Sequence, residues 1–257
     1  MNSTTEQQPP YVRRRMSGHV LWLTLNRAKQ RNPLSSGMIA ALHSQFLEAA
    51  DDEAVRVIVI TAEGPVFSSG HDLKEVSGRL DGVEPDPEKR VGTILDACAE
   101  MMLALVALPK PVIASVQGVA SAAGCQLVSM CDLAIAADHT RYCTPGVNIG
   151  SFCTTPLVGI GRNMQRKHAM EMALTGDMFS AEDAFRFGLV NRVVPEQDLA
   201  EETERLAQHI AARSAVGIAE ASTFAGDDDR CVAAEVVVDR REGMPYVIPV
   251  PRAQCFG

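Results

Sequence analysis

Two segments rich in small residues are suited to holding a negative charge against the main chain. They are residues 65–73, with the sequence PVFSSGHDL, and residues 118–127, with the sequence GVASAAGCQL. Each follows an apolar, β-branched stretch and leads toward a helical pattern, so both are predicted to be strand-to-helix loops. The first N–H groups of a helix lack partners within it, and the helix dipole favours an anion there. Two such N–H groups directed at one point would form an oxyanion hole, in which each donor lowers a barrier by about 3–4 kcal/mol.

Other reactive combinations are missing from the sequence. The six histidines do not cluster, and the seven cysteines (98, 125, 131, 143, 153, 231 and 255) include no C-x-x-C pair. A metal site needs Cys or His at ligand spacing, so no metal site is predicted. The Gly-x-Ser-x-Gly elbow of serine hydrolases is also missing. Small-residue loops, however, also occur where a helix merely packs closely on a sheet, so residue types alone leave both interpretations of the two loops open.

The apolar pattern that must position these loops alternates between strands and helices. Strands are expected at residues 19–25, 55–61, 112–116 and 132–137, with a short one within 189–194. Helices are expected from residue 35, over 91–108 and through most of the chain after 162, with a surface loop at 80–89. Strands that alternate with helices indicate βαβ units and mainly parallel pairing, within one large α/β domain.

Composition and charge argue against several classes of protein. Hydrophobic residues make up 46% and charged residues 22% of the chain, which is typical of a globular protein with a sizeable core. The net charge is −8 and no basic face is evident, so no nucleic-acid partner is expected. No apolar stretch is long enough for a membrane span, and the polar residues 1–10 lack the apolar segment of a secretory signal. We therefore expect a cytoplasmic protein with residues 1–10 as a flexible leader.

The order and spacing of several motifs resemble the enoyl-CoA hydratase/isomerase (crotonase) family, especially its enoyl-CoA hydratase domain-containing subgroup. The resemblance extends from about Val20 to Phe224, and its motifs are LNR at 25–27, NPL at 32–34, FSSGHDL at 67–73, GVASAAGCQL at 118–127, CDL at 131–133, TPGVN at 144–148 and TG at 175–176. It implies an α/β fold, the crotonase (ClpP-like) spiral of ββα turns, over residues 11–195. A C-terminal helical region would follow over 196–243, and a proline-rich, extended tail over 244–257.

The resemblance also implies where a substrate binds. By position, the oxyanion donors are the backbone N–H groups of His71 and Ala123. Coenzyme A would lie between two groups of residues, namely Lys29, Gln30 and Arg31 on one side and Ser69, Gly70, Asp72, Leu73 and Lys74 on the other. The basic members would meet its phosphates, although each taken alone is equally consistent with a solvated surface charge. No cofactor is expected beyond the coenzyme A of the substrate, and the family habit implies a homotrimer or a dimer of trimers.

The sequence departs from the family pattern where hydratases carry two glutamates. Those positions hold Gln126 and Gly146, and the position of an aspartate used by some isomerases holds Thr154. An amide does not usefully accept a proton near pH 7 and glycine has no side chain, so efficient hydration by the usual mechanism is not expected. The side chains that remain candidates near an enolate are those of His71, Gln126, Cys143, Asn148 and Cys153.

Several activities stay open at this point. The first is an acyl-CoA-transforming enzyme of the lyase or isomerase type that holds a thioester enolate. The second is a genuine enoyl-CoA hydratase of fatty-acid metabolism with displaced acid and base groups. A third is a decarboxylase, because a family decarboxylase also carries a Gly-His-Asp loop and loss of CO2 creates the enolate without a base. The fourth is a non-catalytic acyl-CoA-binding protein, which the loss of both glutamates also supports.

Overall fold

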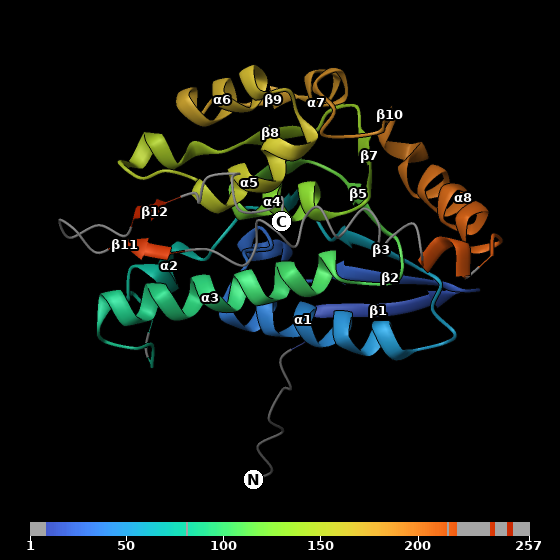
Figure 1. The fold of residues 1–257 in the computed structure, drawn as a ribbon, viewed down its shortest axis with the longest axis horizontal. Coiled ribbons are helices and arrows are strands. Elements are labelled where there is room, and N and C mark those ends of the chain that lie inside the picture. The colour runs from blue at the N-terminus through green and yellow to red at the C-terminus, as the bar shows by residue number, and fades with distance from the viewer. Residues whose placement is uncertain (1–8, 81, 215, 220–236, 240–245, 249–257) are drawn as a thin grey trace, which may run out of the picture.

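Six strands form the larger of two main β-sheets in the computed structural model (Figure 1). The structure describes residues 9–80, 82–214, 216–219, 237–239 and 246–248. Along the sheet the strands are β1 (Val12–Ser17), β2 (Val20–Leu25), β3 (Val57–Ala62), β5 (Val112–Val116), β7 (Leu133–Ala137) and β10 (Arg192–Val194). All neighbours are parallel except β1 and β2. The central strands are apolar along both faces because both faces are covered.

A smaller sheet lies beside the first and carries the two loops. It consists of β4 (Val66–Ser68), β6 (Val119–Ser121), β8 (Arg141–Cys143) and β9 (Phe179–Ser180), with only the β8–β9 pair antiparallel. The pairs β3–β4, β5–β6 and β7–β8 each place one strand in the large sheet and the next in the small one before helical structure follows. This repeated turn confirms the predicted α/β spiral of ββα units.

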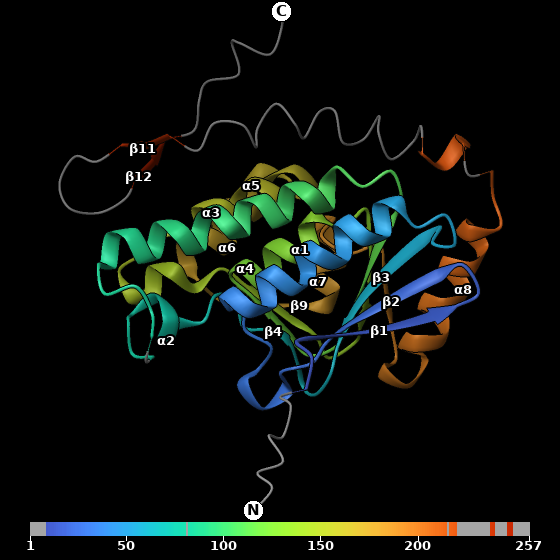
Figure 2. The same cartoon turned by 90° about the horizontal axis from the view of Figure 1, so that it is seen from below.

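Helices cover the sheets, and α1 and α3 lie side by side across one face (Figure 2). The helices are α1 (Ser36–Asp51), α2 (Leu73–Val76), α3 (Pro87–Val106), α4 (Ala123–Met130), α5 (Thr154–Asn163), α6 (Arg166–Thr175), α7 (Ala181–Phe187) and α8 (Leu199–Ala211). Short 3-10 helices are η1 (Ala28–Gln30), η2 (Pro145–Ile149) and η3 (Glu196–Asp198). Phe46 of α1, Met101 of α3 and Ile58 of β3 share one buried core, so burial holds these layers together.

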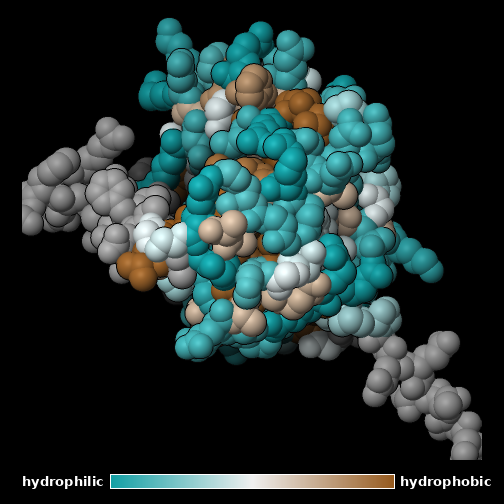
Figure 3. Space-filling view, turned by 90° about the vertical axis from the view of Figure 1, so that its right-hand side faces the viewer, coloured by the Kyte–Doolittle hydropathy of each residue, from teal (hydrophilic) through white to brown (hydrophobic). Residues whose placement is uncertain are grey.

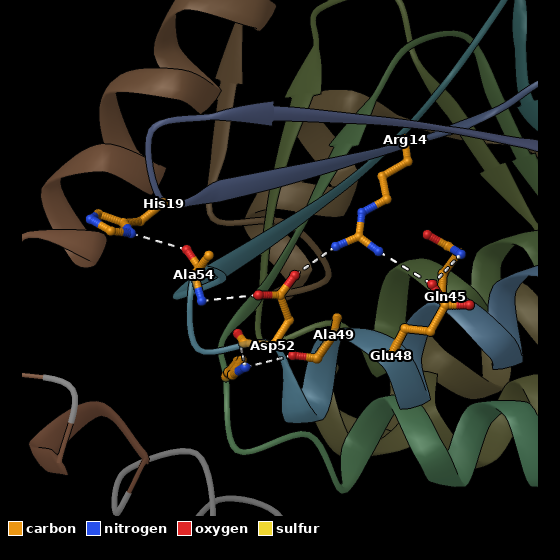
Figure 4. Close-up of polar contacts among 8 residues, drawn as sticks. Arg14, His19, Gln45, Glu48, Ala49, Asp52 and Ala54 are labelled. Atoms are coloured by element: carbon orange, nitrogen blue, oxygen red, sulfur yellow. Dashed lines mark hydrogen bonds and ion pairs between the residues drawn. The ribbon is translucent and has the colours of Figure 1, made fainter.

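A polar cluster closes the carboxyl end of α1 (Figure 4). The Lys110 ammonium group donates to the carbonyl oxygens of Ala49 (2.5 Å) and Asp52 (2.8 Å). Arg14 of β1 donates to the carboxylates of Asp52 (2.8 Å) and Glu48 (3.3 Å). Cations beside the last carbonyls of a helix typically stabilise it by about 0.3–1 kcal/mol each. The cluster therefore ties α1 to the edge strand β1 and to the turn that enters β5.

The helix α8 covers one face of the large sheet, where it packs across β2, β3, β5 and β7. Thr203 is fully buried there, and its hydroxyl lies 3.1 Å from that of Ser115 in β5. The Glu204 carboxylate accepts from Trp22 Nε1 (2.8 Å) and from the Ser17 hydroxyl (2.6 Å), which fixes α8 against the β1–β2 hairpin. The side of the molecule on which α8 lies is predominantly hydrophilic (Figure 3). No helix among the described residues is long and apolar enough to cross a membrane.

Some element boundaries differ from those expected. The helix predicted at 91–108 begins at Pro87, because the Asp86 carboxylate caps the N–H groups of Glu88 and Lys89, so the loop predicted at 80–89 is shorter. Strand β1 was not expected, since most of its side chains face solvent and show no apolar alternation. The stretch predicted to be helical, 196–243, contains the strand β11 (Val237–Asp239), which pairs with β12 (Tyr246–Ile248) of the tail. Most of the leader and of the C-terminal segment lies outside the described residues.

Candidate active site

The two small-residue loops meet at one place in the structure. A Cβ added to Gly70 would fall 2.9 Å from the Cβ of Ala122 and 3.2 Å from the nitrogen of Ala123. Gly124 lies against β4 in the same way, because a Cβ there would fall 2.5 Å from the carbonyl oxygen of Ser68. Real Cβ atoms do not approach other atoms so closely, so glycine is required at both positions. The small residues thus bring the main chains of the two loops into direct contact.

The N–H groups of His71 and Ala123 lie on these adjoining segments. Ala123 is the first residue of α4, so its N–H has no acceptor within the helix. The Leu34 N–H donates to the Gly70 carbonyl (2.8 Å), and this contact holds the peptide that carries the His71 N–H. Within the described ranges neither N–H donates to a protein acceptor. Both predicted donors are therefore free to bind a ligand oxygen.

Ala122, between the second loop and α4, has an unusual backbone conformation. Its φ is 50° and its ψ is −120°, a region that residues with a side chain rarely adopt. Its N–H donates to the carbonyl of Cys143 in β8 (2.9 Å), and its carbonyl accepts from the Gln126 N–H (3.0 Å). The peptide group that ends in the Ala123 N–H is therefore held from two sides.

Two polar side chains of these loops each carry a buried atom that has no protein partner. The Nε2 atom of His71 and the Oε1 atom of Gln126 make no hydrogen bond with any described residue. Burial lowers the pKa of His71 below its ordinary value of 6.5, so the imidazole is neutral near pH 7. Gln126 is only 5% exposed. Because unpaired buried polar atoms are costly, each is a candidate for contact with a ligand or a bound water.

The segment at residues 146–154, which follows β8, holds the second position where a family glutamate was expected. Gly146 is buried in η2, and a Cβ there would fall 3.0 Å from the nitrogen and 3.1 Å from the sulfur of Cys153. The backbone at Phe152 and Cys153, together with the Cys153 thiol, thus crowds the space that a side chain at position 146 would enter. Thr154 begins α5, and Asn148 donates to the Gly176 carbonyl (3.5 Å), which engages its amide with the end of α6.

The thiols around the site are protonated near pH 7. Burial raises the pKa of Cys125, Cys143 and Cys153. The Cys143 thiol donates to the Ser121 hydroxyl (3.3 Å), which places it against the second loop. A protonated thiol is a poor nucleophile and a poor base, so these cysteines supply small apolar volume. No group of His, Cys, Asp and Glu side chains suited to a metal ion occurs in the described part of the chain.

The residues predicted to contact coenzyme A lie in two surface segments. Lys29, Gln30 and Arg31 are exposed in and after η1, and the carbonyl of Arg31 accepts from the Ser69 N–H (3.1 Å). On the other side, Asp72 caps the Lys74 N–H (2.8 Å) and Leu73 is 63% exposed. No described residue forms a salt bridge with Lys29, Arg31 or Lys74. These cations are consequently available to an anionic ligand.

Two features of the site have no signal in the sequence. Alanine normally avoids a positive φ, so the conformation of Ala122 was not expected from its residue type. The contact between Gly146 and Cys153 was also not expected, because it depends on how the chain folds back between η2 and α5. A buried residue next to the first loop, Asn32, further braces the site by donating to the Val66 carbonyl (2.8 Å).

Known proteins share both the sequence and the fold. Residues 15–227 match the family model described as "Enoyl-CoA hydratase/isomerase". The chain is 43% identical over 221 residues to the rat "Enoyl-CoA hydratase domain-containing protein 3, mitochondrial", a match covering 85% of this chain and 72% of the relative. The crystal structure of human enoyl coenzyme A hydratase domain-containing protein 3 is 42% identical with a TM-score of 0.78, covering 83% of this chain and 82% of that one. A Mycobacterium smegmatis enoyl-CoA hydratase structure is 43% identical, also with a TM-score of 0.78, over 84% and 82% of the two chains.

These relatives correct one expectation. The polar amino terminus led us to expect a cytoplasmic protein, but the rat relative is named as a mitochondrial protein. Four further vertebrate relatives, 43–50% identical, carry the same name. The cytoplasmic assignment is therefore wrong on this evidence. The polar composition of residues 1–10 does not by itself identify a compartment.

Proposed function

Because this chain belongs to the enoyl-CoA hydratase/isomerase family, we propose that it binds acyl-CoA thioesters and stabilises the thioester enolate. The thioester oxygen would accept hydrogen bonds from the backbone N–H groups of His71 and Ala123. The observation that carries this proposal is the contact of the two loops at Gly70 and Ala122, which leaves both N–H groups without protein partners. Removing one such donor from an enzyme typically costs a factor of about 10²–10³ in rate.

The same site is poorly equipped for hydration. Addition of water across a double bond requires one group that activates the water and one that manages the proton at C2. Gln126 and Gly146 provide neither, and the nearby thiols of Cys143 and Cys153 are protonated. The neutral imidazole of His71 is the side chain of this region best able to take up or release a proton. We therefore propose enolate chemistry of the lyase or isomerase type, with hydration of simple enoyl thioesters slow.

The exposed cations give the proposed substrate its second anchor. Lys29 and Arg31 lie on the segment whose Arg31 carbonyl bonds to Ser69, and Lys74 follows the helix start at Asp72. Phosphates of coenzyme A would interact with these cations through charge-assisted hydrogen bonds. This arrangement would place the thioester end of the ligand at Gly70 and the nucleotide end at the surface. No cofactor other than the coenzyme A of the substrate is part of this proposal.

A second candidate function is acyl-CoA binding without turnover. It is favoured by a specific observation, namely that both expected carboxylate positions lack an acid and that Cys153 crowds the space beside Gly146. Such a protein would still need the two N–H donors and the cations to hold a thioester. The two functions therefore share a binding site and differ only in whether product forms.

Calorimetry with coenzyme A and a series of acyl-CoA thioesters, followed by mass spectrometry of each ligand after long incubation, tests both. Binding together with a changed product supports the enzyme and names its reaction. Tight binding with every thioester recovered intact favours the binding protein. Failure to bind any acyl-CoA would remove both proposals.

Two further properties are proposed by likeness to relatives. The mitochondrial names of the vertebrate proteins support a mitochondrial setting for this chain, which fractionation of the source cells would test. A trimer or dimer of trimers, the family habit, is proposed for its assembly. Light scattering of the purified chain measures the mass directly, and a monomer would contradict the assembly proposal.

A further inference from the structure

We propose that Ala122 is a positioning residue: its methyl group packs against Gly70 and sets the spacing between the N–H groups of His71 and Ala123. The inference rests on the proposed function, since it concerns how the same two donors are arranged. Ala122 would not touch the reacting atoms, but would act through the peptide groups on either side of it.

The backbone of Ala122 is strained. Among the described residues, only Arg31, Asn32 and Ala122 combine a side chain with a positive φ. With a φ of 50° and a ψ of −120°, Ala122 has the conformation of the first central residue of a type II′ turn, where glycine is favoured. Such strain persists only where the surrounding structure enforces it, and it concentrates at functional sites.

The hydrogen bonds around Ala122 fix the direction in which the Ala123 N–H group points. The Ala122 carbonyl points to the Gln126 N–H (3.0 Å) in the first turn of α4. In a trans peptide the C=O and the following N–H point in opposite directions. The Ala123 N–H is therefore directed out of the helix start. The Ala122 N–H, bonded to the Cys143 carbonyl (2.9 Å), anchors the other side of the residue to β8.

The methyl group explains why a strained alanine has a use at this position. A Cβ on Gly70 would lie 2.9 Å from the Ala122 methyl carbon, so that methyl occupies the space beside Gly70. Gly70 immediately precedes the first donor, and Ala122 immediately precedes the second. The methyl is thus a spacer between the two segments. Glycine at position 122 would relieve the strain and keep both backbone hydrogen bonds, but it would leave a gap beside Gly70 into which the two segments can shift.

The test is the variant Ala122→Gly, with Ala181→Gly as its control. Ala181 is a buried alanine at the first position of α7, whereas the partly buried Ala122 is the N-cap of α4; both stand at a helix start, but Ala181 does not have a positive φ. The probe is trans-cinnamoyl-CoA, whose absorption moves to longer wavelength when hydrogen bonds polarise the thioester carbonyl. This shift reports donor geometry and is insensitive to a purely structural role. Melting temperature and the affinity for free coenzyme A are measured in parallel.

We expect Ala122→Gly to melt at the same or a higher temperature than the parent protein and to bind coenzyme A equally well. The shift of bound cinnamoyl-CoA should fall by half or more, and any turnover should fall about tenfold with little change in KM. Ala181→Gly should lower the melting temperature and leave the shift intact. A full shift in Ala122→Gly would overturn this inference and leave the proposed function standing. A parent protein that does not bind or polarise cinnamoyl-CoA would overturn the proposed function, and this inference with it.

Discussion

The candidate site has two halves, of which one is built from backbone groups and the other depends on side chains. The first half is main chain: the peptides around Gly70 and Ala122 meet so closely that neither loop has room for a larger residue at the contact. The second half, around Gln126 and Gly146, depends on side chains, and there the expected acids are replaced by an amide and by nothing. Hydrogen-bond donors of the first half come from peptide groups, which every residue except proline carries.

The difference shows which part of such a site a fold can preserve. Backbone donors survive any substitution that keeps the loops small and the helix start in place, so the ability to hold an oxyanion is a property of the architecture. Acid and base chemistry is carried by single side chains, and one substitution removes it. A chain can therefore keep the binding half and change or lose the reaction, which is what we propose for this chain.

The largest effect is expected from introducing carboxylates at positions 126 and 146, in the half that depends on side chains. The change is Gln126→Glu with Gly146→Glu, in a chain that also carries Cys153→Ala to remove the sulfur lying 3.1 Å from the new Cβ. The Cys153 nitrogen (3.0 Å) and the Phe152 carbonyl carbon (3.1 Å) must then shift slightly, so retained crotonyl-CoA binding by the variant is checked first. Paired acid and base groups typically contribute a factor of about 10²–10⁴, so hydration of crotonyl-CoA should rise by that order over the parent protein. The rate is measured from the loss of enoyl absorption.

Gln126→Glu alone is the matched control, because it adds a carboxylate without a partner. If the triple variant hydrates no faster than this control, the main-chain half is not competent and the comparison fails. A parent protein that already hydrates crotonyl-CoA at ordinary family rates would show that acid and base groups lie elsewhere.

The second-largest effect is expected from adding a methyl group at the contact between the two loops. Gly70→Ala places a methyl 2.9 Å from Ala122, whereas Gly150→Ala meets nothing within 4 Å, although both glycines have a positive φ. Each substitution carries about 1–2 kcal/mol of backbone strain, and only Gly70→Ala adds about 1–3 kcal/mol of overpacking. In urea unfolding, Gly70→Ala should lose more free energy of unfolding than Gly150→Ala, and only Gly70→Ala should abolish acyl-CoA binding. Equal losses of stability would show that the contact between the two loops has room for a methyl group.

A smaller effect is expected at the outer end of the ligand. Lys74→Ala should weaken coenzyme A binding about fivefold, which corresponds to about 1 kcal/mol for one exposed charged contact. Lys89→Ala is the control, because Lys89 is exposed and pairs with Glu84 (2.8 Å) at the start of α3. Calorimetry at two salt concentrations is the measurement, and the difference should shrink as salt rises. The same affinity in both variants would leave Lys74 as a solvated surface charge.

The smallest effect concerns the imidazole of His71 in the first loop. Burial lowers the pKa of His71 below 6.5 in the folded state, so at pH values below about 6.5 the unfolded chain binds more protons and folding becomes less favourable. His71→Asn should remove this component, which amounts to about 1 kcal/mol or less per pH unit, while keeping the backbone donor. Melting temperatures between pH 5 and 8 should therefore fall less steeply toward acid in the variant than in the parent protein. Parallel curves would mean that the imidazole is not desolvated.

Sequence reasoning recovered the parts of this molecule that depend on local chemistry. Ser35 caps α1 by accepting from the Met38 N–H (3.3 Å), as a serine before an apolar helical pattern should. The loop before α4 was recognisable because its run of small residues permits close approach. The roles of His71 and Ala123 as donors and of Lys29 and Lys74 as phosphate contacts stay predictions, for which the structure supplies supporting geometry.

What sequence reasoning missed depends on contacts between distant segments or on exposure. Ala122 adopts its conformation because β8 and α4 hold it from two sides, and an alanine carries no sign of that. The crowding of Gly146 by Cys153 is a tertiary contact of the same kind. The strand β1 escaped detection because three consecutive arginines face solvent, which erases the apolar alternation on which strand prediction relies.

Those arginines have a consequence for the solubility of the folded protein. Strand β1 stands at the outer edge of the large sheet and, among the described strands, pairs with β2 alone, so none of them occupies the edge where a strand from another molecule could add. Arg13, Arg14 and Arg15 lie along that strand, the first two paired with carboxylates, and charged side chains on an edge strand disfavour such pairing. Behind it β2 reads VLWLTL, an apolar segment of the kind that nucleates aggregation when exposed. Strand β1 thus shields β2 from pairing with other molecules. A chain that begins after Ser17 should therefore aggregate and precipitate.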